Sequence, residues 1–284
     1  MKRDLKDCTF IIPIRIESTD RLRNVITVLC YIASNFDTNI IVKEVDTDSK
    51  FKEKALPQIK EYCDDVSCIR HIFEKSEDPL FLREKILNEM LILTRTKVVV
   101  NYDCDVIFPL EVYEEACRRI VENESDMIYP YGEGPWQYRV RATDEVVSNF
   151  LNNGCDLKIL QDVSWVDNAG AGWVQFLNRD VYFQGGMENE NFMGSAPDDY
   201  ERENRFKTLG YRVHRINQFI CHLEHSRGMN SYPQSMTQHP YWDQNQKLWE
   251  YLEKCSKEEL EEYYSNQPYL EKYKKALRML YDRN

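Results

Sequence analysis

Short apolar runs alternate with stretches of helical periodicity over the first hundred residues. Runs rich in β-branched residues at 8–16, 39–45, 68–74 and 97–108 predict strands. The segments between them repeat apolar residues every three or four positions, which indicates amphipathic helices. Strands that alternate with helices form parallel sheets covered on both faces. The pattern therefore predicts the α/β class, with a mostly parallel sheet and flanking helices.

The pattern changes after residue 108. A helix is expected from residue 110, and the pattern over residues 132–172 is irregular, with tryptophans among glycines and polar residues, as in segments that shape a pocket. From residue 241 the periodicity predicts two or three amphipathic helices, and Ser256 with Glu259 has the spacing of a capping box. We expect a main domain over residues 1–235 and a C-terminal helical extension over residues 236–284 packed on it.

Composition narrows the classes of partner. The 284 residues include 37 Lys and Arg against 48 Asp and Glu, a formal net charge of -11, which argues against binding nucleic acid or an anionic membrane surface. No run approaches the roughly 18 apolar residues of a membrane span. The nine cysteines are scattered without a C-x-x-C pair, which favours reduced thiols and a cytoplasmic location. A soluble chain with a neutral or metal-bridged partner is expected.

Three short clusters carry candidate chemistry. The first is Asp103-Cys104-Asp105, at the carboxyl end of the fourth predicted strand. Open α/β sheets bind ligands at that edge, and paired carboxylates suit Mn²⁺ or Mg²⁺, which could bridge a diphosphate. The alternative is a solvated loop that happens to carry two acids.

The second cluster is His222-Leu223-Glu224-His225, which follows an apolar piece that resembles a strand. Imidazoles at this spacing reach one metal ion if the backbone turns, and ions such as Mn²⁺ accept mixed nitrogen and oxygen ligands. The alternative is that both histidines are packed or surface side chains.

The third cluster is Asp198-Asp199, which opens a helical stretch after a Gly-Ser-Ala-Pro segment. Acids in the first turn are favoured by the helix dipole, so capping alone explains them. The functional alternative is a general base, with one carboxylate binding an acceptor hydroxyl and the other taking its proton.

Taken in chain order, these segments resemble those of the GT-A-fold glycosyltransferases. Within that fold family they are similar to the β-1,4-galactosyltransferase and polypeptide N-acetylgalactosaminyltransferase group. The blocks FIIPIR, FLREKILN and YDCDVIFP carry the first part of this resemblance. It implies a Rossmann-like GT-A domain in which Arg15 contacts the nucleotide and Phe81 and Arg83 contact uracil and diphosphate. It also makes Asp105 the direct metal ligand, with Asp103 and Cys104 on the nucleotide side and Asp103 a further metal candidate.

The block FMGSAPDDYERENRFKTLGYRV is similar to the family's acidic stretch without a gap. It implies that Asp198 binds the acceptor and that Asp199 is the catalytic base. The sequence CHLEHSR then resembles the terminal metal block. There His225 matches the ligand histidine, and His222 stands where the family usually has a methionine ligand.

The chain also departs from the family. Ser195 replaces the tryptophan of the flexible acceptor loop, and Ala196-Pro197 stand where glycines are usual. The acceptor is therefore not implied beyond a carbohydrate or glycoconjugate. The segment NAGAGW at 168–173 corresponds roughly to the donor-sugar gate, which leaves galactose, glucose and their N-acetyl forms open.

The resemblance implies an inverting, metal-dependent, galactosyltransferase-like enzyme that uses a UDP-sugar donor. Glu44 and Asp46, at the end of the second predicted strand, are candidates to face uracil or ribose, or are simply solvated acids. Two other functions stay open. A nucleotidyltransferase also pairs such a sheet with acid-bound metal but usually has a glycine-rich phosphate loop, where this chain has PIRIESTD. The second alternative function is a module that binds nucleotide sugars without turnover.

Overall fold

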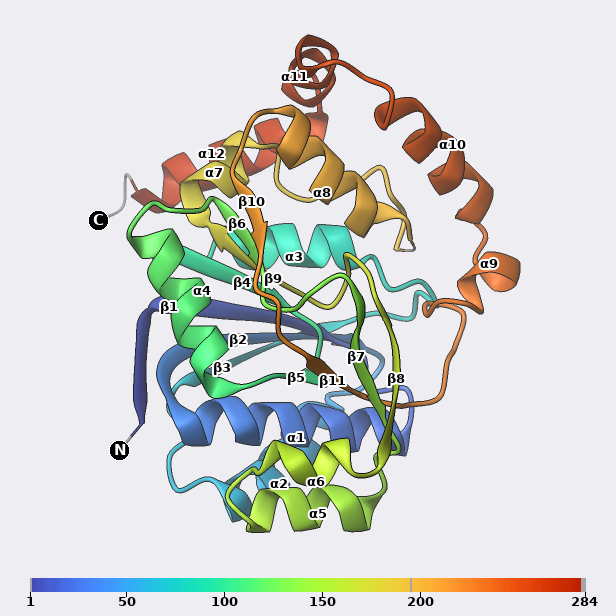
Figure 1. Cartoon of the computed structure of the whole chain (residues 1–284). Helices are drawn as coiled ribbons and strands as arrows, with labels where there is room; N and C mark the ends of the chain where they lie inside the picture. Colours follow the sequence, from blue (N-terminus) through green and yellow to red (C-terminus); the bar gives the residue numbers. More distant parts are fainter. Residues whose placement is uncertain (1, 195, 282–284) are drawn as a thin grey trace.

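The computed structural model describes residues 2–194 and 196–281, so Ser195 in the expected acceptor loop lies outside the described residues. The molecule is built around one large twisted sheet with helices on both faces (Figure 1). A smaller sheet stands beside its carboxyl edge. This arrangement confirms the predicted α/β class.

Among the described residues, seven strands form the large sheet. Their order across the sheet is β10 (Val213–Arg215), β6 (Met127–Tyr129), β9 (Val174–Asn178), β4 (Val98–Tyr102), β1 (Arg3–Ile14), β2 (Phe36–Asp46) and β3 (Ile69–Lys75). Every neighbouring pair is parallel except the two that β9 makes with β4 and β6. The sheet is thus mostly parallel, as predicted, with one antiparallel strand that the apolar pattern did not reveal.

A second sheet is formed by four strands of the described chain. Their order is β5 (Val106–Ile107), β11 (Ile220–Leu223), β7 (Gly134–Val140) and β8 (Ser164–Ala169). The irregular pattern over residues 132–172 did not reveal the elements there, because β7 and β8 pair and two helices lie between them. Most positions of β7 and β8 are partly or fully exposed, so their side chains show no clean apolar alternation.

The fourth predicted strand, 97–108, is two strands in different sheets. β4 ends at Tyr102, and β5 begins at Val106. The Asp103 backbone N–H donates to the Trp173 carbonyl, and the Leu223 N–H donates to the Asp105 carbonyl. The chain therefore passes from one sheet to the other at the acidic pair.

Helices cover both faces of the large sheet. In chain order, the helices before the C-terminal ones are α1 (Thr19–Asn35), the π-helical turn η1 (Phe51–Ala55), α2 (Leu56–Tyr62), α3 (Arg83–Leu91), α4 (Leu110–Val121), α5 (Asp144–Asn152), α6 (Leu157–Gln161), α7 (Arg179–Gln184) and α8 (Asp198–Thr208). Of these, α5 packs on α1, and α6 packs on the small sheet. Figure 1 shows α1 on one face and α3 on the other. Tyr31 of α1 and Tyr113 of α4 pack 6.2 Å apart between ring centroids, which places both helices on the same core. Burial of these apolar faces is the main stabilising contribution.

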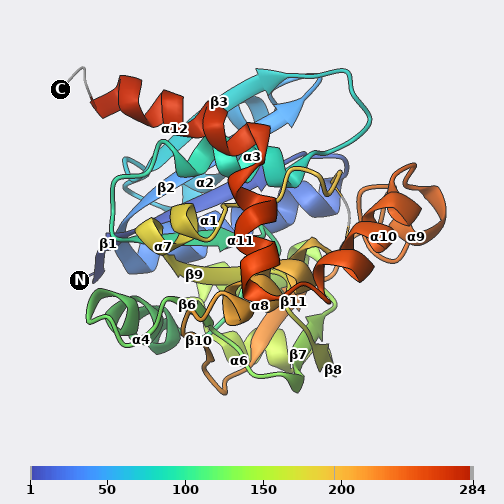
Figure 2. The ribbon, with the colours of Figure 1, turned by 90° about the horizontal axis from the view of Figure 1, so that it is seen from above.

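The C-terminal helices are α9 (Ser235–Gln238), α10 (Trp242–Leu252), α11 (Lys257–Ser265) and α12 (Pro268–Tyr281). Seen from above, they run from the rim of the sheet back across α8 and α3 (Figure 2). Ser256 and Glu259 form the predicted capping box at the start of α11. The Tyr264 side chain is buried, and its hydroxyl donates to Glu201 Oε1 of α8 at 2.5 Å. The domain boundary at residues 235 and 236 stays a prediction.

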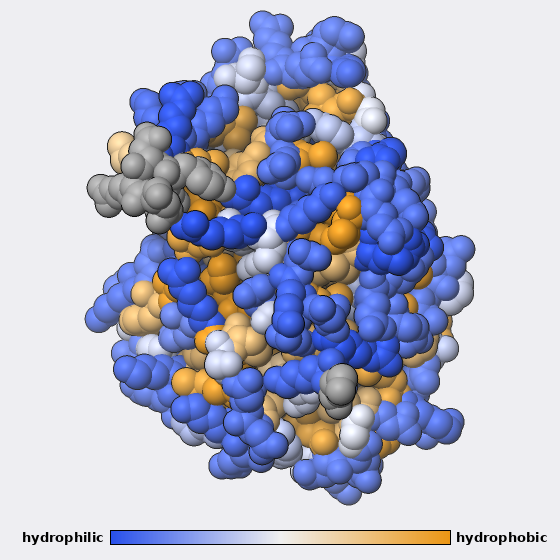
Figure 3. Space-filling view, turned by 90° about the vertical axis from the view of Figure 1, so that its left-hand side faces the viewer, coloured by the Kyte–Doolittle hydropathy of each residue, from blue (hydrophilic) through white to orange (hydrophobic). Residues whose placement is uncertain are grey.

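The surface and the cysteines agree with the composition. The face in Figure 3 is mostly hydrophilic, with apolar residues showing in separate patches. All nine cysteines are free thiols. In the described part of the chain, no helix combines the length and the apolar character needed to cross a bilayer.

Candidate active site

A pocket lies where β1 and β4 end and the chain crosses to the small sheet. Its walls come from segments far apart in the sequence: the ends of β1 and β4, the start of α3, the loop before α8, and the segment after β11. It collects Arg15, Phe81, Arg83, Asp103, Cys104, Asp105, Asp198, Asp199, His222 and His225. All of the predicted site residues except Glu44 and Asp46 therefore meet in one pocket.

Asp105, His222 and His225 form a tight cluster at one side of this pocket. One potential ligand atom from each side chain lies within 4.8 Å of those of the other two. His225 Nε2 is 2.9 Å from Asp105 Oδ2, and His222 Nε2 is 3.8 Å from the same oxygen. The antiparallel pairing of β11 with β5 sets His222 opposite Val106, next to Asp105 in the chain. The two strands thus create the cluster.

The cluster fits a divalent cation. Asp105 Oδ1 is buried and has no hydrogen-bond partner among the described residues, although an unpaired buried carboxylate oxygen is costly. One carboxylate and two imidazoles suit Mn²⁺ and related ions. Although burial acts to raise it, the pKa of Asp105 lies well below its ordinary value because His222 and His225 stabilise the charged form. Three of the four proposed metal ligands are therefore brought together.

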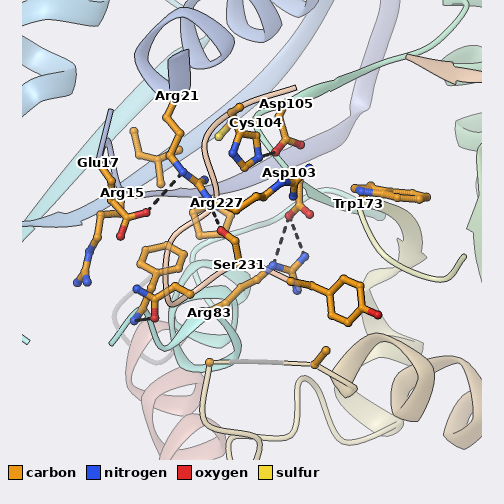
Figure 4. A pocket seen from close by; sticks show the side chains of 18 of the residues that line it. Arg15, Glu17, Arg21, Arg83, Asp103, Cys104, Asp105, Trp173, Arg227 and Ser231 are labelled. Atoms are coloured by element: carbon orange, nitrogen blue, oxygen red, sulfur yellow. Dashed lines mark hydrogen bonds and ion pairs between the residues drawn. The ribbon is translucent and has the colours of Figure 1, made fainter. Parts of the chain in front are cut away.

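Asp103 lies outside that cluster. Its Oδ1 accepts from Arg83 Nη2 at 3.0 Å, and Figure 4 shows the two side chains pointing at each other. Burial raises the pKa of Asp103 despite this arginine. Arg83 Nη1 also lies 3.5 Å from Asp198 Oδ2 and 3.9 Å from Asp199 Oδ1. Arg83 thus links the acidic pair after β4 to the acidic pair that opens α8.

Asp198 and Asp199 differ in their surroundings. Burial, followed by the charge of Asp199, raises the pKa of Asp198 to about 7. The Asp199 Oδ1 atom accepts from the buried Arg202 guanidinium, which also pairs with Glu188 at 2.7 Å. The other oxygen of Asp199 faces Gly172, where an added Cβ would lie 2.9 Å from it. Both acids stand in the first turn of α8, where the helix dipole favours them, although the N-cap residue itself is Pro197.

Arg15 and Phe81 lie together at another wall of the pocket. The Arg15 guanidinium stands 5.4 Å from the Phe81 ring centroid and donates to the carbonyls of Val45, Asp78 and Pro79. Its Nη2 atom is buried and has no partner among the described residues. The pair therefore offers one aromatic face and one unused donor.

Glu44 and Asp46 have other surroundings. The Glu44 side chain is fully buried, and its oxygens accept from the Phe51 backbone N–H and the Ser49 hydroxyl and contact His71 Nε2. That network places Glu44 inside the fold. Asp46 pairs with Lys50 at 2.9 Å and lines a neighbouring hollow that also includes Arg15.

Several pocket residues were not predicted. Arg21 Nη2 donates to Ser231 Oγ at 2.6 Å, and Arg227 Nη2 lies 3.5 Å from Glu224 Oε1, so two further cations line the pocket (Figure 4). Arg227 stands two residues after His225, and this spacing was a usable signal. No local pattern marks Arg21, because its role depends on where α1 meets the segment after β11.

Trp173 also lines the pocket. Its backbone is left-handed, at φ 65°, a conformation that costs a bulky residue roughly 1–2 kcal/mol. The ring lies 5.4 Å from that of Tyr131 and 6.1 Å from that of His222. Strain of this kind clusters at functional sites. Trp173 is the last residue of NAGAGW, and the role of this segment as a donor-sugar gate stays a prediction.

Comparison with solved structures identifies the architecture. A mannosyltransferase from Pyrobaculum calidifontis, solved with GDP-Man and Mn²⁺, superposes with a TM-score of 0.50 at 15% identity and covers 78% of this chain. GalNAc-T7, solved with UDP, GalNAc and Mn²⁺, superposes with a TM-score of 0.50 at 12% identity, again over 78% of this chain. This chain has the GT-A glycosyltransferase fold. The matched regions span 58% and 44% of the two neighbours.

No family model matches the sequence, and no curated protein matches it significantly. The GT-A likeness is therefore one of fold, since sequence identity is low throughout.

Proposed function

We propose that this chain is an inverting, metal-dependent glycosyltransferase that moves a hexose or N-acetylhexosamine from a UDP-sugar to an acceptor hydroxyl. The observation that supports this most is the convergence, in one pocket, of the Asp105, His222 and His225 cluster with the acidic pair Asp198 and Asp199. The first suits a cation that binds a diphosphate, and the second suits a base.

Asp105, His222 and His225 would hold Mn²⁺ or Mg²⁺. When bound, such an ion neutralises charge that develops on a leaving diphosphate. Asp103 has Arg83 as its partner, so its contribution to the ion is proposed to depend on the nucleotide. Arg83, Arg21 and Arg227 add positive charge near the same place, which suits an anionic leaving group.

The donor nucleotide is proposed to lie against Arg15 and Phe81. The unpartnered Arg15 Nη2 is available to a carbonyl or phosphate oxygen, and the Phe81 ring offers a face to a base. Cys104 lines the same pocket beside the acidic pair, and burial keeps the pKa of its thiol above the ordinary value. Cys104 is therefore a neutral neighbour of the nucleotide in this proposal.

Transfer then needs one proton acceptor. Asp199 takes the proton of the acceptor hydroxyl as that oxygen forms a bond to the anomeric carbon, and the bond from this carbon to the UDP oxygen breaks with its electron pair. Attack opposite the leaving group inverts the anomeric centre. Asp198 is proposed to bind the acceptor, and Arg202 holds Asp199 in place through Oδ1.

The test is an assay of UDP-Gal, UDP-Glc, UDP-GalNAc and UDP-GlcNAc with a panel of glycoside acceptors and Mn²⁺. GDP-mannose belongs in the same panel, because one structural neighbour was solved with it. We expect UDP release that depends on the acceptor and a product whose anomeric proton coupling by NMR shows a β linkage from an α-linked donor. Excess EDTA should abolish UDP binding in calorimetry.

The same panel, extended by a nucleoside triphosphate with a sugar phosphate, separates the other functions. A nucleotidyltransferase would release pyrophosphate from a nucleoside triphosphate and a sugar phosphate. A non-catalytic nucleotide-sugar-binding module would bind the donor without releasing UDP, with or without an acceptor. Either result would replace the proposed activity.

A further inference from the structure

Glu224 connects His222 to an arginine on the neighbouring strand. Glu224 Oε1 lies 2.8 Å from His222 Nδ1, the ring nitrogen that does not face Asp105. The same carboxylate accepts from Arg139 Nε at 2.9 Å and from Arg139 Nη2 at 2.7 Å. This two-point contact restricts the rotation of the carboxylate, as bidentate arginine pairs do.

The contact is supported by the register of the small sheet. His222 of β11 pairs with Arg139 of β7, and Arg139 pairs with Trp165 of β8. The Arg139 guanidinium lies 5.1 Å from the Trp165 ring centroid and donates through Nη1 to Asp167 Oδ2 at 3.1 Å. Three strands thus place one continuous row of side chains next to the pocket.

We infer that Glu224 and Arg139 are positioning residues that set the tautomer and the orientation of His222, so that its Nε2 lone pair faces the proposed cation. The inference rests on the metal role in the proposed function. A histidine that binds a metal through one nitrogen usually donates its other N–H to a carboxylate or carbonyl, which fixes the ring. Glu224 meets that requirement, and Arg139 keeps the carboxylate turned toward Nδ1.

The second histidine is held differently. His225 Nδ1 lies 2.7 Å from the Ser226 carbonyl oxygen, so a backbone group orients its ring. Glu224 is not among the three residues whose ligand atoms cluster, within the part of the chain that the structure describes. It therefore acts through His222 and not as a ligand itself. Its removal should affect one of the two imidazoles and leave the other as an internal reference.

The first test uses metal-free protein labelled with ¹⁵N-histidine, at a pH where the His222 ring is neutral. The chain has five histidines, so long-range ¹H–¹⁵N spectra assign each ring by substitution. We expect His222 to be protonated on Nδ1 in the wild type and to lose this uniform tautomer in Glu224→Ala, whereas His225 does not change. An unchanged His222 tautomer in Glu224→Ala would overturn the inference, and this readout needs no metal or substrate.

The second test measures Mn²⁺ affinity by calorimetry without donor sugar. Glu224→Ala should weaken Mn²⁺ binding roughly 10- to 100-fold, the scale known for residues that support a metal ligand. Arg139→Met should weaken it by a smaller factor. Glu224→Gln keeps an oxygen that accepts from Nδ1 and should recover part of the loss. In a His222→Ala background, Glu224→Ala should add nothing, because the ring on which it acts is gone. An equal loss in both backgrounds would contradict the inference.

Asp126→Ala is the matched control. It removes the carboxylate partner of Arg212, another two-point pair at 2.8 and 3.0 Å, from residues that do not line the pocket. Mn²⁺ affinity should stay unchanged in this variant. If the wild type binds neither Mn²⁺ nor Mg²⁺, the metal role in the proposed function fails, while the tautomer experiment still reports on Glu224. If Glu224→Ala does not fold, Arg139→Met carries both measurements, with smaller changes in the same direction expected.

Discussion

Asp103 and Asp105 stand two residues apart, yet their carboxylates face different partners. Asp103 Oδ1 lies 3.0 Å from Arg83 Nη2, whereas Asp105 Oδ2 lies 2.9 Å from His225 Nε2. The chain leaves one sheet and enters the other between them, so they do not act as an equivalent pair. Asp103 pairs with an arginine, and Asp105 is part of the histidine cluster.

This difference predicts unequal effects on cation binding. Asp105→Asn should weaken Mn²⁺ binding by more than roughly 100-fold, beyond the loss expected for a residue that only supports a ligand, because a charged ligand is removed. Asp103→Asn should change it by less than about tenfold without nucleotide, because Asp103 lies outside the cluster. Calorimetry with Mn²⁺ and Mg²⁺ measures both. Similar losses in the two variants would show that both acids bind the ion directly.

Asp199→Asn should separate the base from the helix start. Asn keeps an oxygen that can accept from the buried Arg202, so the variant should fold and bind UDP-sugar normally, with a lower Tm because the charge that pairs with Arg202 is gone. Loss of the proton acceptor should lower kcat by ~10²-fold or more. Asp198→Asn should instead raise mainly the KM for the acceptor. A wild-type kcat in Asp199→Asn would refute the role of Asp199 as the base, and only the nucleotide-sugar site of the proposal would then stand.

The raised pKa of Asp198, about 7, predicts a pH-dependent stability. The ordinary Asp pKa is about 3.9, so between these values the folded state holds a proton that the unfolded chain does not. Stability from this group therefore rises as pH falls from above 7 toward 4. Asp198→Asn should raise Tm at pH 8, on the order of 3 °C, and this gain should shrink at pH 5.

Scanning calorimetry at the two pH values checks the Asp198 prediction. Asp37→Asn serves as its control, because Asp37 is an exposed acid on β2 whose side chain is 55% accessible. A stabilisation by Asp198→Asn that is the same at pH 5 and pH 8 would refute the titration argument and indicate an effect of shape alone.

The left-handed backbone of Trp173 predicts an unusual order of two small substitutions. Glycine normally destabilises relative to alanine, but at φ 65° alanine keeps the Cβ strain and glycine does not. Trp173→Gly should therefore be more stable than Trp173→Ala by about 1 kcal/mol in urea unfolding. Both variants should lose UDP-sugar affinity to a similar degree if the ring contacts the donor sugar. A more stable alanine variant would mean that the loop relaxes.

Contacts of α11 predict that the C-terminal helices do not detach as an independent unit. The Tyr264 ring lies 4.4 Å from the Arg205 guanidinium of α8, and its hydroxyl also accepts from Asn189 at 2.9 Å. Tyr264→Ala should cost about 3–5 kcal/mol, as for other buried aromatics, and Tyr264→Phe about 1–3 kcal/mol through the lost hydrogen bonds with Glu201 and Asn189. A chain that ends at residue 235 should not unfold cooperatively. Native-like melting of that truncation would instead support a separable extension.

The sequence alone determined the class of fold and most of the candidate chemistry. Buried parallel strands are continuously apolar, so β1, β2 and β4 were visible as runs, and the capping box at Ser256 depends only on local hydrogen bonds between side chains and backbone. Asp105, His222 and His225 were predicted from short motifs, and the structure places them in one cluster. These signals are local, since each depends on residues close together in the chain.

Only the tertiary structure decided that Asp103 and Asp105 contact different partners. Three features depend on strand register, which residues far apart in the chain determine together. They are the crossing from β4 to β5, the pairing of β7 with β8, and the row of side chains from His222 through Arg139 to Trp165. The same holds for Glu44, whose acidic side chain gave no sign of its burial against Phe51 and His71. Whether a carboxylate acts as a metal ligand, as a base or as a buried hydrogen-bond acceptor depends on its neighbours in space. The neighbours in sequence do not specify that role.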